Sequence, residues 1–130
     1  MRIIAINHDP ARLETLPPSW EVLTVTTPIV RTYRDLSRRA LREEWDTSVV
    51  VVQDDVRFDQ GQPKRYPDET LVVYGQTTGV HVCPRAFAAS PSGWDQLREA
   101  WSEWAGGTAC RGFTLIANRA GLILDVTHHA

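Results

Sequence analysis

The stretch VVVVQDD, from Val49 to Asp55, is the most informative part of this 130-residue chain. Four consecutive β-branched valines are typical of a strand buried on both faces, as in the centre of a parallel α/β sheet. Two carboxylates, Asp54 and Asp55, follow where that strand is expected to end. Open α/β sheets bind ligands at the carboxyl ends of their strands. The stretch therefore predicts a central strand with a polar site at its end.

Two adjacent carboxylates repel each other, so Asp54 and Asp55 need a cation, a hydrogen-bonding ligand or solvent nearby. Carboxylate oxygens are hard ligands that suit Mg²⁺ and Mn²⁺. One interpretation is a divalent cation that carries a phosphate-bearing ligand. The alternative is a solvated loop or a helix cap.

The remaining pattern predicts an α/β fold. Asp9 followed by Pro10 is typical of a helix start, with a capping acid and a proline in the first turn. We expect one domain over residues 1–130, with a mixed, mostly parallel sheet and flanking helices. Strands are expected at 2–6, 21–26, 49–52, 71–74, 80–83 and 122–126, the fourth and fifth as a hairpin, and helices at 11–16, 32–45, 92–105 and 113–117.

The composition is that of an ordinary globular protein, with 42% hydrophobic and 23% charged residues. A formal net charge of -2 gives no overall attraction to nucleic acid or to an anionic membrane. The apolar run at the amino terminus ends at Asn7 and is too short for a signal peptide or a membrane span. The two cysteines form no CxxC pair. We therefore expect a cytoplasmic protein without a membrane span.

Four arginines, at positions 31, 34, 38 and 42, are spaced three or four apart, from just before the helix expected at 32–45 into its last turn. This spacing places them on one helical face, opposite the apolar one. A solvated face is the favoured interpretation. The sharper alternative is contact with a phosphate or with an acceptor substrate.

Several segments together resemble glycosyltransferases of the A-type fold, and among them family 25, which builds lipooligosaccharide and decorates collagen. The segments occur in the family's order and cover nearly the whole chain. They are the strand at 3–7 with the following Arg12, the helix end at 40–45, the acidic strand at 50–56, the strand and proline turn at 79–86, and the last strand with its histidines at 121–129.

The resemblance implies a small, metal-dependent glycosyltransferase that moves a sugar from a nucleotide diphosphate sugar to an unknown acceptor. Asp55 would bind Mn²⁺ or Mg²⁺ directly, and His128 or His129 would complete the metal shell. Asp54 would contact the sugar or ribose, or share the cation. Asp54 and Asp55 would thus form the catalytic pair.

The resemblance further implies that Asn7 and Arg12 lie near the nucleotide. The alternative is a catalytically reduced A-type domain that binds a ligand or a protein partner without turnover. Gln53 favours this alternative because the family usually has an acid there, as does the lack of an acid at 107–110.

One alternative concerns the histidines alone, and another concerns the whole chain. Without the resemblance, His128 and His129 are as well explained as a solvated tail. A receiver-like or other flavodoxin-like module is a weaker third interpretation. It would require a lysine near the end of the chain, whereas the only lysine is Lys64.

Overall fold

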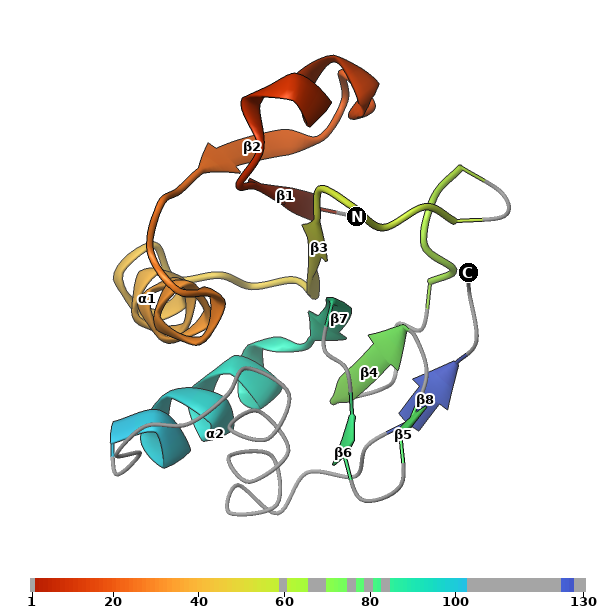
Figure 1. The fold of residues 1–130 in the computed structure, drawn as a ribbon. Helices are drawn as coiled ribbons and strands as arrows, with labels where there is room; N and C mark the ends of the chain where they lie inside the picture. The colour runs from red at the N-terminus through yellow and green to blue at the C-terminus, as the bar shows by residue number, and fades with distance from the viewer. Residues whose placement is uncertain are drawn as a thin grey trace.

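The computed structural model describes residues 2–58, 61–65, 70–74, 77–78, 81–82, 85–102 and 125–127. In Figure 1 the two longer helices lie together on one side of the sheet, and a short helical segment lies beside the two strands nearest the amino terminus. The described strands are β1 (Arg2–Asn7), β2 (Glu21–Thr24), β3 (Val49–Gln53), β4 (Leu71–Tyr74), β5 (Thr77–Thr78), β6 (His81–Val82), β7 (Ala86–Ala89) and β8 (Asp125–Thr127). The described helices are η1 (Pro10–Thr15), a 3₁₀-helix, and the α-helices α1 (Ile29–Arg42) and α2 (Pro91–Ser102).

The main sheet has six described strands in the order β2-β1-β3-β7-β4-β8. β1 is parallel to β2 and β3, and β4 is parallel to β8. β7 runs antiparallel to both of its neighbours. Five strands therefore share one direction, and the predicted α/β fold with a mixed, mostly parallel sheet is confirmed.

β3 is buried on both faces, as the valine run predicts. Val49 and Val51 pack into a core that contains Tyr33 of α1 and Trp94 of α2, so both helices cover this face. Val50 and Val52 pack into a second core on the opposite face. That second face is covered by Leu16 and Trp20, which lie between η1 and β2, and by Phe58, which follows β3.

α1 begins and ends three residues earlier than the sequence predicts. Pro28 precedes its first turn, and the backbone N–H of Thr32 already donates to the carbonyl of Pro28. At the other end Glu44 adopts a φ of 53°, and the N–H of Trp45 donates to the carbonyl of Ala40. A residue in the left-handed region followed by this bond closes a helix. The predicted extension to residue 45 is therefore wrong, although Trp45 still packs against the core.

The region after β4 was predicted least well. The predicted hairpin between 71–74 and 80–83 is wrong, because β6 pairs with β5 and β4 pairs with β7. β7 was missed because its sequence, AFAA, contains little β propensity. Its four residues are buried between β3 and β4, so packing decides their conformation.

α2 starts close to the predicted position. The Ser90 side chain accepts a hydrogen bond from the N–H of Gly93 at 3.2 Å. A Cβ at Gly93 would collide with the carbonyl oxygen of Thr70, so the glycine permits α2 to approach the chain before β4. Of the described helices, none combines the length and the apolarity that a bilayer crossing requires. The helix predicted at 113–117 lies outside the described residues.

Candidate functional site

The two acids at the end of β3 lie in a β-turn. The N–H of Val56 donates to the carbonyl of Gln53 at 3.1 Å, so Asp54 and Asp55 occupy the centre of the turn. Asp54 points inward and is 2% exposed, whereas the Asp55 side chain is 32% exposed. The adjacent pair predicted from the sequence therefore divides into one interior acid and one surface acid.

The turn lies at a change of direction in the sheet. The chain passes from β1 to β2 on one side of β1, and then through α1 to β3 on the other side. Such a switch point opens a crevice outside the carboxyl ends of the two central strands, and ligands of open α/β sheets bind there. The ends of β1 and β3, at Asn7 and Gln53, flank this position.

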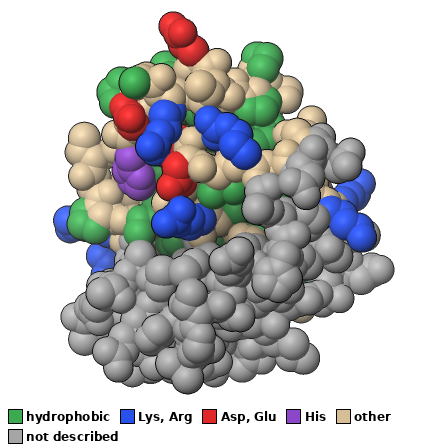
Figure 2. Space-filling view, turned by 45° about the vertical axis from the view of Figure 1, so that its right-hand side comes forward, with side chains coloured by type: hydrophobic (Ala, Val, Ile, Leu, Met, Phe, Trp, Pro, Cys, Tyr) green, Lys and Arg blue, Asp and Glu red, His purple; other side chains and the backbone are tan. Residues whose placement is uncertain are grey.

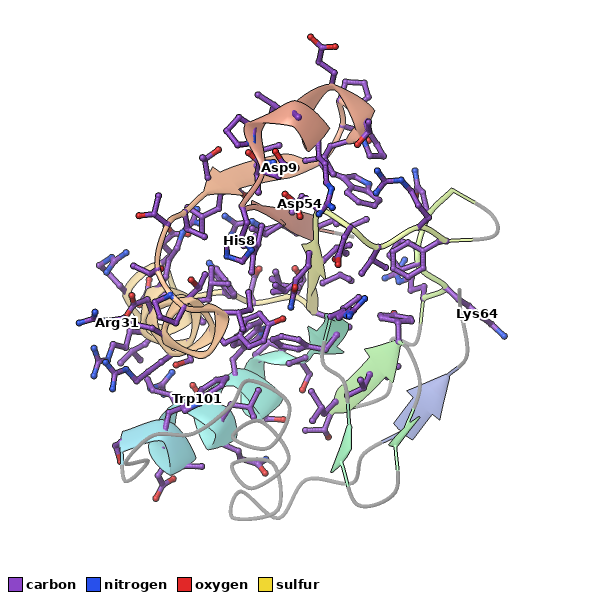
Figure 3. The ribbon with its side chains drawn as sticks, in the orientation of Figure 1. His8, Asp9, Arg31, Asp54, Lys64 and Trp101 are labelled. Atoms are coloured by element: carbon purple, nitrogen blue, oxygen red, sulfur yellow. The ribbon has the colours of Figure 1, made fainter. Side chains whose placement is uncertain are left out.

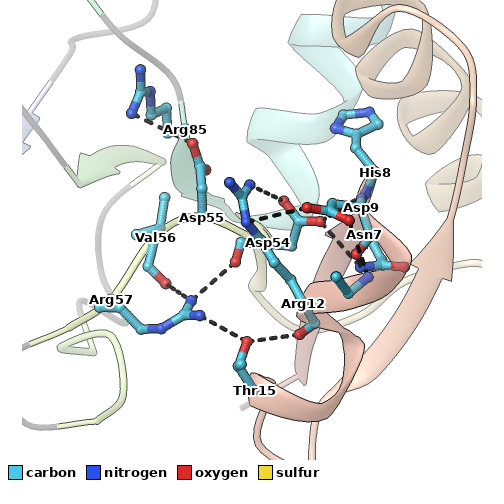
Figure 4. A network of polar contacts seen from close by, with 11 residues as sticks. Asn7, His8, Asp9, Arg12, Thr15, Asp54, Asp55, Val56, Arg57 and Arg85 are labelled. Atoms are coloured by element: carbon cyan, nitrogen blue, oxygen red, sulfur yellow. Dashed lines mark hydrogen bonds and ion pairs between the residues drawn. The ribbon is translucent and has the colours of Figure 1, made fainter.

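Asp54 holds the loop that follows β1. Its Oδ2 atom accepts hydrogen bonds from the backbone N–H of His8 at 2.8 Å and of Asp9 at 3.0 Å. The same oxygen accepts from Nδ2 of Asn7 at 3.1 Å. Nη1 of Arg12 lies 3.5 Å from Oδ1. Figure 4 shows these donors converging on one carboxylate, while the His8 imidazole points away from it.

The pKa of Asp54 is lowered from its ordinary value of 3.8. Burial of the carboxylate acts in the opposite direction, but it is outweighed by the N–H groups of Asp9 and His8 and by Arg12. Hydrogen bonds and a cation that favour the charged form lower a carboxyl pKa. Asp54 is therefore ionised in the folded protein at neutral pH.

The stability that Asp54 contributes is expected to be lost in acid. A carboxyl whose pKa is lower in the folded state stabilises the fold above its unfolded pKa, and this contribution disappears as the pH falls through the folded pKa. Urea unfolding of the wild type and of Asp54→Asn between pH 6 and pH 2.5 measures it. The difference in unfolding free energy between the two proteins should be constant above about pH 5 and shrink below about pH 4. A difference that does not change over this range would contradict the assignment.

Asn7 is also an interior residue. It is 1% exposed, and Nδ2 donates to the carbonyl of Asp9 at 2.8 Å as well as to Asp54. Its Oδ1 accepts from the hydroxyl of Thr24 in β2 at 3.4 Å. Asn7, which the family resemblance places near a nucleotide, thus joins the ends of β1, β2 and β3.

Asp55 faces the surface and pairs with Arg85. Nη1 of Arg85 lies 3.5 Å from Oδ2 of Asp55, and the Arg85 side chain is 65% exposed. Such an exposed pair is worth about 1 kcal/mol or less, so a stronger ligand displaces it easily. The backbone carbonyl of Arg85 accepts from the N–H of Gln53 at 2.8 Å, which fixes the base of the arginine beside the turn.

Arg12 and Arg57 complete the rim of the site. Nη1 of Arg57 donates to the carbonyls of Asp54 at 3.0 Å and Val56 at 2.9 Å, and Nη2 donates to the Thr15 hydroxyl at 2.7 Å. These bonds hold the guanidinium through neutral oxygens, so its charge has no carboxylate partner among the described residues. Figure 2 shows arginine or lysine side chains around acidic ones on one face, with a histidine beside them.

The metal shell predicted from the sequence is only partly within the described residues. His128 and His129 lie outside them. β8 ends in the same direction as β3 but is separated from it by β7 and β4. With about 4.8 Å between neighbouring strands, β8 lies about 14 Å from β3 across the sheet. Among the described residues there is no group of three histidines, cysteines or acids that could hold a metal ion.

Gln53 serves the fold at this position. Its Nε2 donates to the hydroxyl of Tyr33 in α1 at 2.9 Å, which joins the end of β3 to the helix layer.

Arg57 and Arg85 were not among the residues predicted for the site. Their proximity to the acids depends on the turn after β3 and on the missed strand β7. Position in the sequence therefore gave no reason to choose them over other arginines.

No protein-family model matches this chain, and no curated protein matches it in sequence. The function must therefore be inferred from the geometry of the site and from the motif resemblance.

Proposed function

We propose that the chain binds a nucleotide diphosphate sugar through a divalent cation at Asp55, and that it transfers the sugar to an acceptor. The observation that carries this proposal is the exposed Asp55 at the switch point of the sheet. Its turn is contacted by Arg85 through Asp55, by Arg12 through Asp54 and by Arg57 through backbone carbonyls. The family resemblance supports the same assignment.

A single exposed carboxylate fits a cation that is held mainly by its ligand. Mg²⁺ is commonly bound by one or two carboxylates together with substrate phosphates and water. Asp55 would supply the carboxylate, and the diphosphate would supply further oxygens. Such a cation would neutralise negative charge on the departing diphosphate.

The three arginines have separate parts in this proposal. Arg57 carries a charge that no described carboxylate neutralises, and its position is fixed by three hydrogen bonds. We assign it to the diphosphate, because guanidinium groups bind phosphate oxygens well. Arg85 would leave Asp55 when the cation binds and would then face the same anion. Arg12 would remain with Asp54 beside the nucleotide.

The buried acid then acts indirectly. Asp54 would hold the loop after β1 against the turn and so fix the distance between Arg12 and Asp55.

In the transfer itself, the bond between the anomeric carbon and the diphosphate breaks, and the diphosphate leaves with the electron pair. The acceptor oxygen forms the new bond to the anomeric carbon, and the proton of its hydroxyl passes to an oxygen of the departing diphosphate. We place this reaction in the cytoplasm, in line with the composition.

A second candidate is a domain that binds the same ligand without turnover. The observation in its favour is that Gln53, at the position of a family acid, is engaged by Tyr33. Its side chain is then committed to the fold. This candidate predicts ligand binding without any product.

The direct test is thermal unfolding with Mn²⁺ and a panel of UDP, GDP and their sugars. A ligand at one hundred times its Kd stabilises the folded state by about 2.7 kcal/mol, so the melting temperature should rise by several degrees. Mn²⁺ alone and nucleotide alone are the controls, and each should give a smaller shift. Release of UDP or GDP from the bound sugar separates the transferase from the binding domain. No shift with any nucleotide diphosphate and Mn²⁺ would contradict both.

A further inference from the structure

A groove between β2 and α1 lies apart from the proposed sugar-nucleotide site. Its volume is about 640 Å³. One wall is the segment from Leu23 to Thr27, and the other is the side of α1. The helix contributes Thr32, Asp35, Leu36, Arg38, Arg39 and Arg42 to the lining.

The first wall is an edge of the sheet that pairs with no further described strand. β2 is the outermost described strand on its side, and it pairs only with β1. The N–H of Val25 donates toward β1, to the carbonyl of Asn7 at 3.0 Å. Because successive backbone groups of a strand point to opposite edges, Val22 and Thr24 direct their N–H and carbonyl groups outward. An unpaired edge of this kind can accept another strand.

The second wall is positively charged. Three arginines line the groove against the single acid Asp35, although the whole chain has a net charge of -2. Arg39 is already engaged, since it binds Glu21 at 2.6 Å and Glu43 at 2.8 Å. Arg38 has only a 3.9 Å contact with Asp35 in which both side chains are 58% exposed.

Arg42 adds a second available charge. It lines the groove one helical turn beyond Arg38, and no ion pair joins it to a described residue. Positions four apart on a helix lie on the same side. Arg38 and Arg42 thus form a short cationic row that runs beside the free edge of β2.

The other face of the edge carries an exposed apolar side chain. Val22 is 39% exposed and points away from the helix wall, because side chains alternate along a strand and Leu23 packs toward α1. A strand added next to β2 would place alternate side chains toward the arginines and the intervening ones beside Val22. Acidic residues suit the first set and apolar residues suit the second.

We propose that this groove binds an extended peptide with alternating acidic and apolar residues, which adds to the sheet beside β2. Backbone hydrogen bonds to β2 would supply affinity, and the arginine row would select acidic side chains. The sequence raised contact of the helix arginines with a phosphate or an acceptor substrate, and a peptide is a different ligand for part of the same row. The site is independent of Asp55 and of the transferase proposal.

The test is fluorescence anisotropy with a labelled eight-residue peptide of alternating Glu and Val. Wild-type protein should bind it. The double variant R38E/R42E should bind at least tenfold more weakly. R31E is the matched control, since it reverses a charge about two turns before Arg38 on the same face of α1, at a position that does not line the groove. Figure 3 labels Arg31 at the surface of this helix. Its affinity should stay within about threefold of the wild type.

A second peptide tests strand addition separately from charge. A repeat of Glu-Glu-Val-Val has the same composition and net charge, but it does not segregate acids onto one face of a strand. It should bind at least tenfold more weakly than the alternating peptide. The proposal would be overturned if both peptides bound equally well, or if R31E lost as much affinity as R38E/R42E. It would also be overturned if the alternating peptide did not bind at 1 mM protein.

Discussion

Asp54→Ala is expected to lower the free energy of unfolding by about 3 kcal/mol. The substitution removes the acceptor of three hydrogen bonds, two of them from the backbone N–H groups of His8 and Asp9. It also leaves Arg12 without its buried partner. Donors that lose a charged acceptor in the interior carry a penalty of about 1–3 kcal/mol each, partly relieved when water enters. Chemical unfolding by urea at pH 7 measures the loss.

Asp55→Ala is the matched control, because it removes the neighbouring acid from the same turn. Asp55 makes one exposed contact with Arg85, so its loss should change the unfolding free energy by less than about 1 kcal/mol. It also removes a negative charge beside another one, which favours the folded state slightly. Similar destabilisation by both variants would contradict the division into an interior acid and a surface acid.

The sequence predicted the frame of the site because the decisive signals are local. The valine run specifies a strand buried on both faces, and β3 packs into both cores as expected. The acid before Pro10 also acts as predicted, since Oδ1 of Asp9 accepts from the N–H of Ala11 at 3.0 Å. These features depend on contacts within a few residues or on a pattern that only one environment satisfies.

The different parts of Asp54 and Asp55 could not be read from the sequence. Two adjacent carboxylates look equivalent until a turn points them in opposite directions. The donors to Asp54 come from residues 7–12, more than 40 positions away, and they meet it only because β1 and β3 are neighbours. Arg85 reaches Asp55 only because β7 inserts next to β3. Non-local pairing of this kind leaves no trace in local periodicity.

The same reasoning explains the helix boundaries. The apolar spacing from 33 to 45 is consistent with one helix, and Trp45 does pack against the core. The chain leaves the helix before that residue, because Glu44 takes a positive φ and redirects the backbone. Burial of Trp45 therefore preserves the apolar pattern beyond the point where helical geometry ends. A pattern of burial predicts which residues face the core more reliably than it predicts where a helix stops.

The same Asp55→Ala substitution is expected to abolish the binding of nucleotide diphosphates that depends on Mn²⁺. In the proposed site Asp55 is the one described carboxylate that is both exposed and at the carboxyl end of β3. A cation held by one protein carboxylate and by phosphate oxygens loses its attachment when that carboxylate is removed. Isothermal titration with Mn²⁺ present should then give no measurable heat of binding, while the unfolding curve stays close to that of the wild type.

Arg57→Ala separates the phosphate contact from the cation. Its guanidinium is held by neutral oxygens, so its removal leaves the Asp54 carboxylate and its hydrogen bonds intact. We expect weaker binding by about 1.5–3 kcal/mol, the range for a hydrogen bond to a charged group, with the dependence on Mn²⁺ retained. Asp55→Ala should instead remove the dependence on Mn²⁺ together with the binding. Normal binding by Asp55→Ala would place the cation elsewhere, and the exposed acid of the turn would then be only a partner of Arg85.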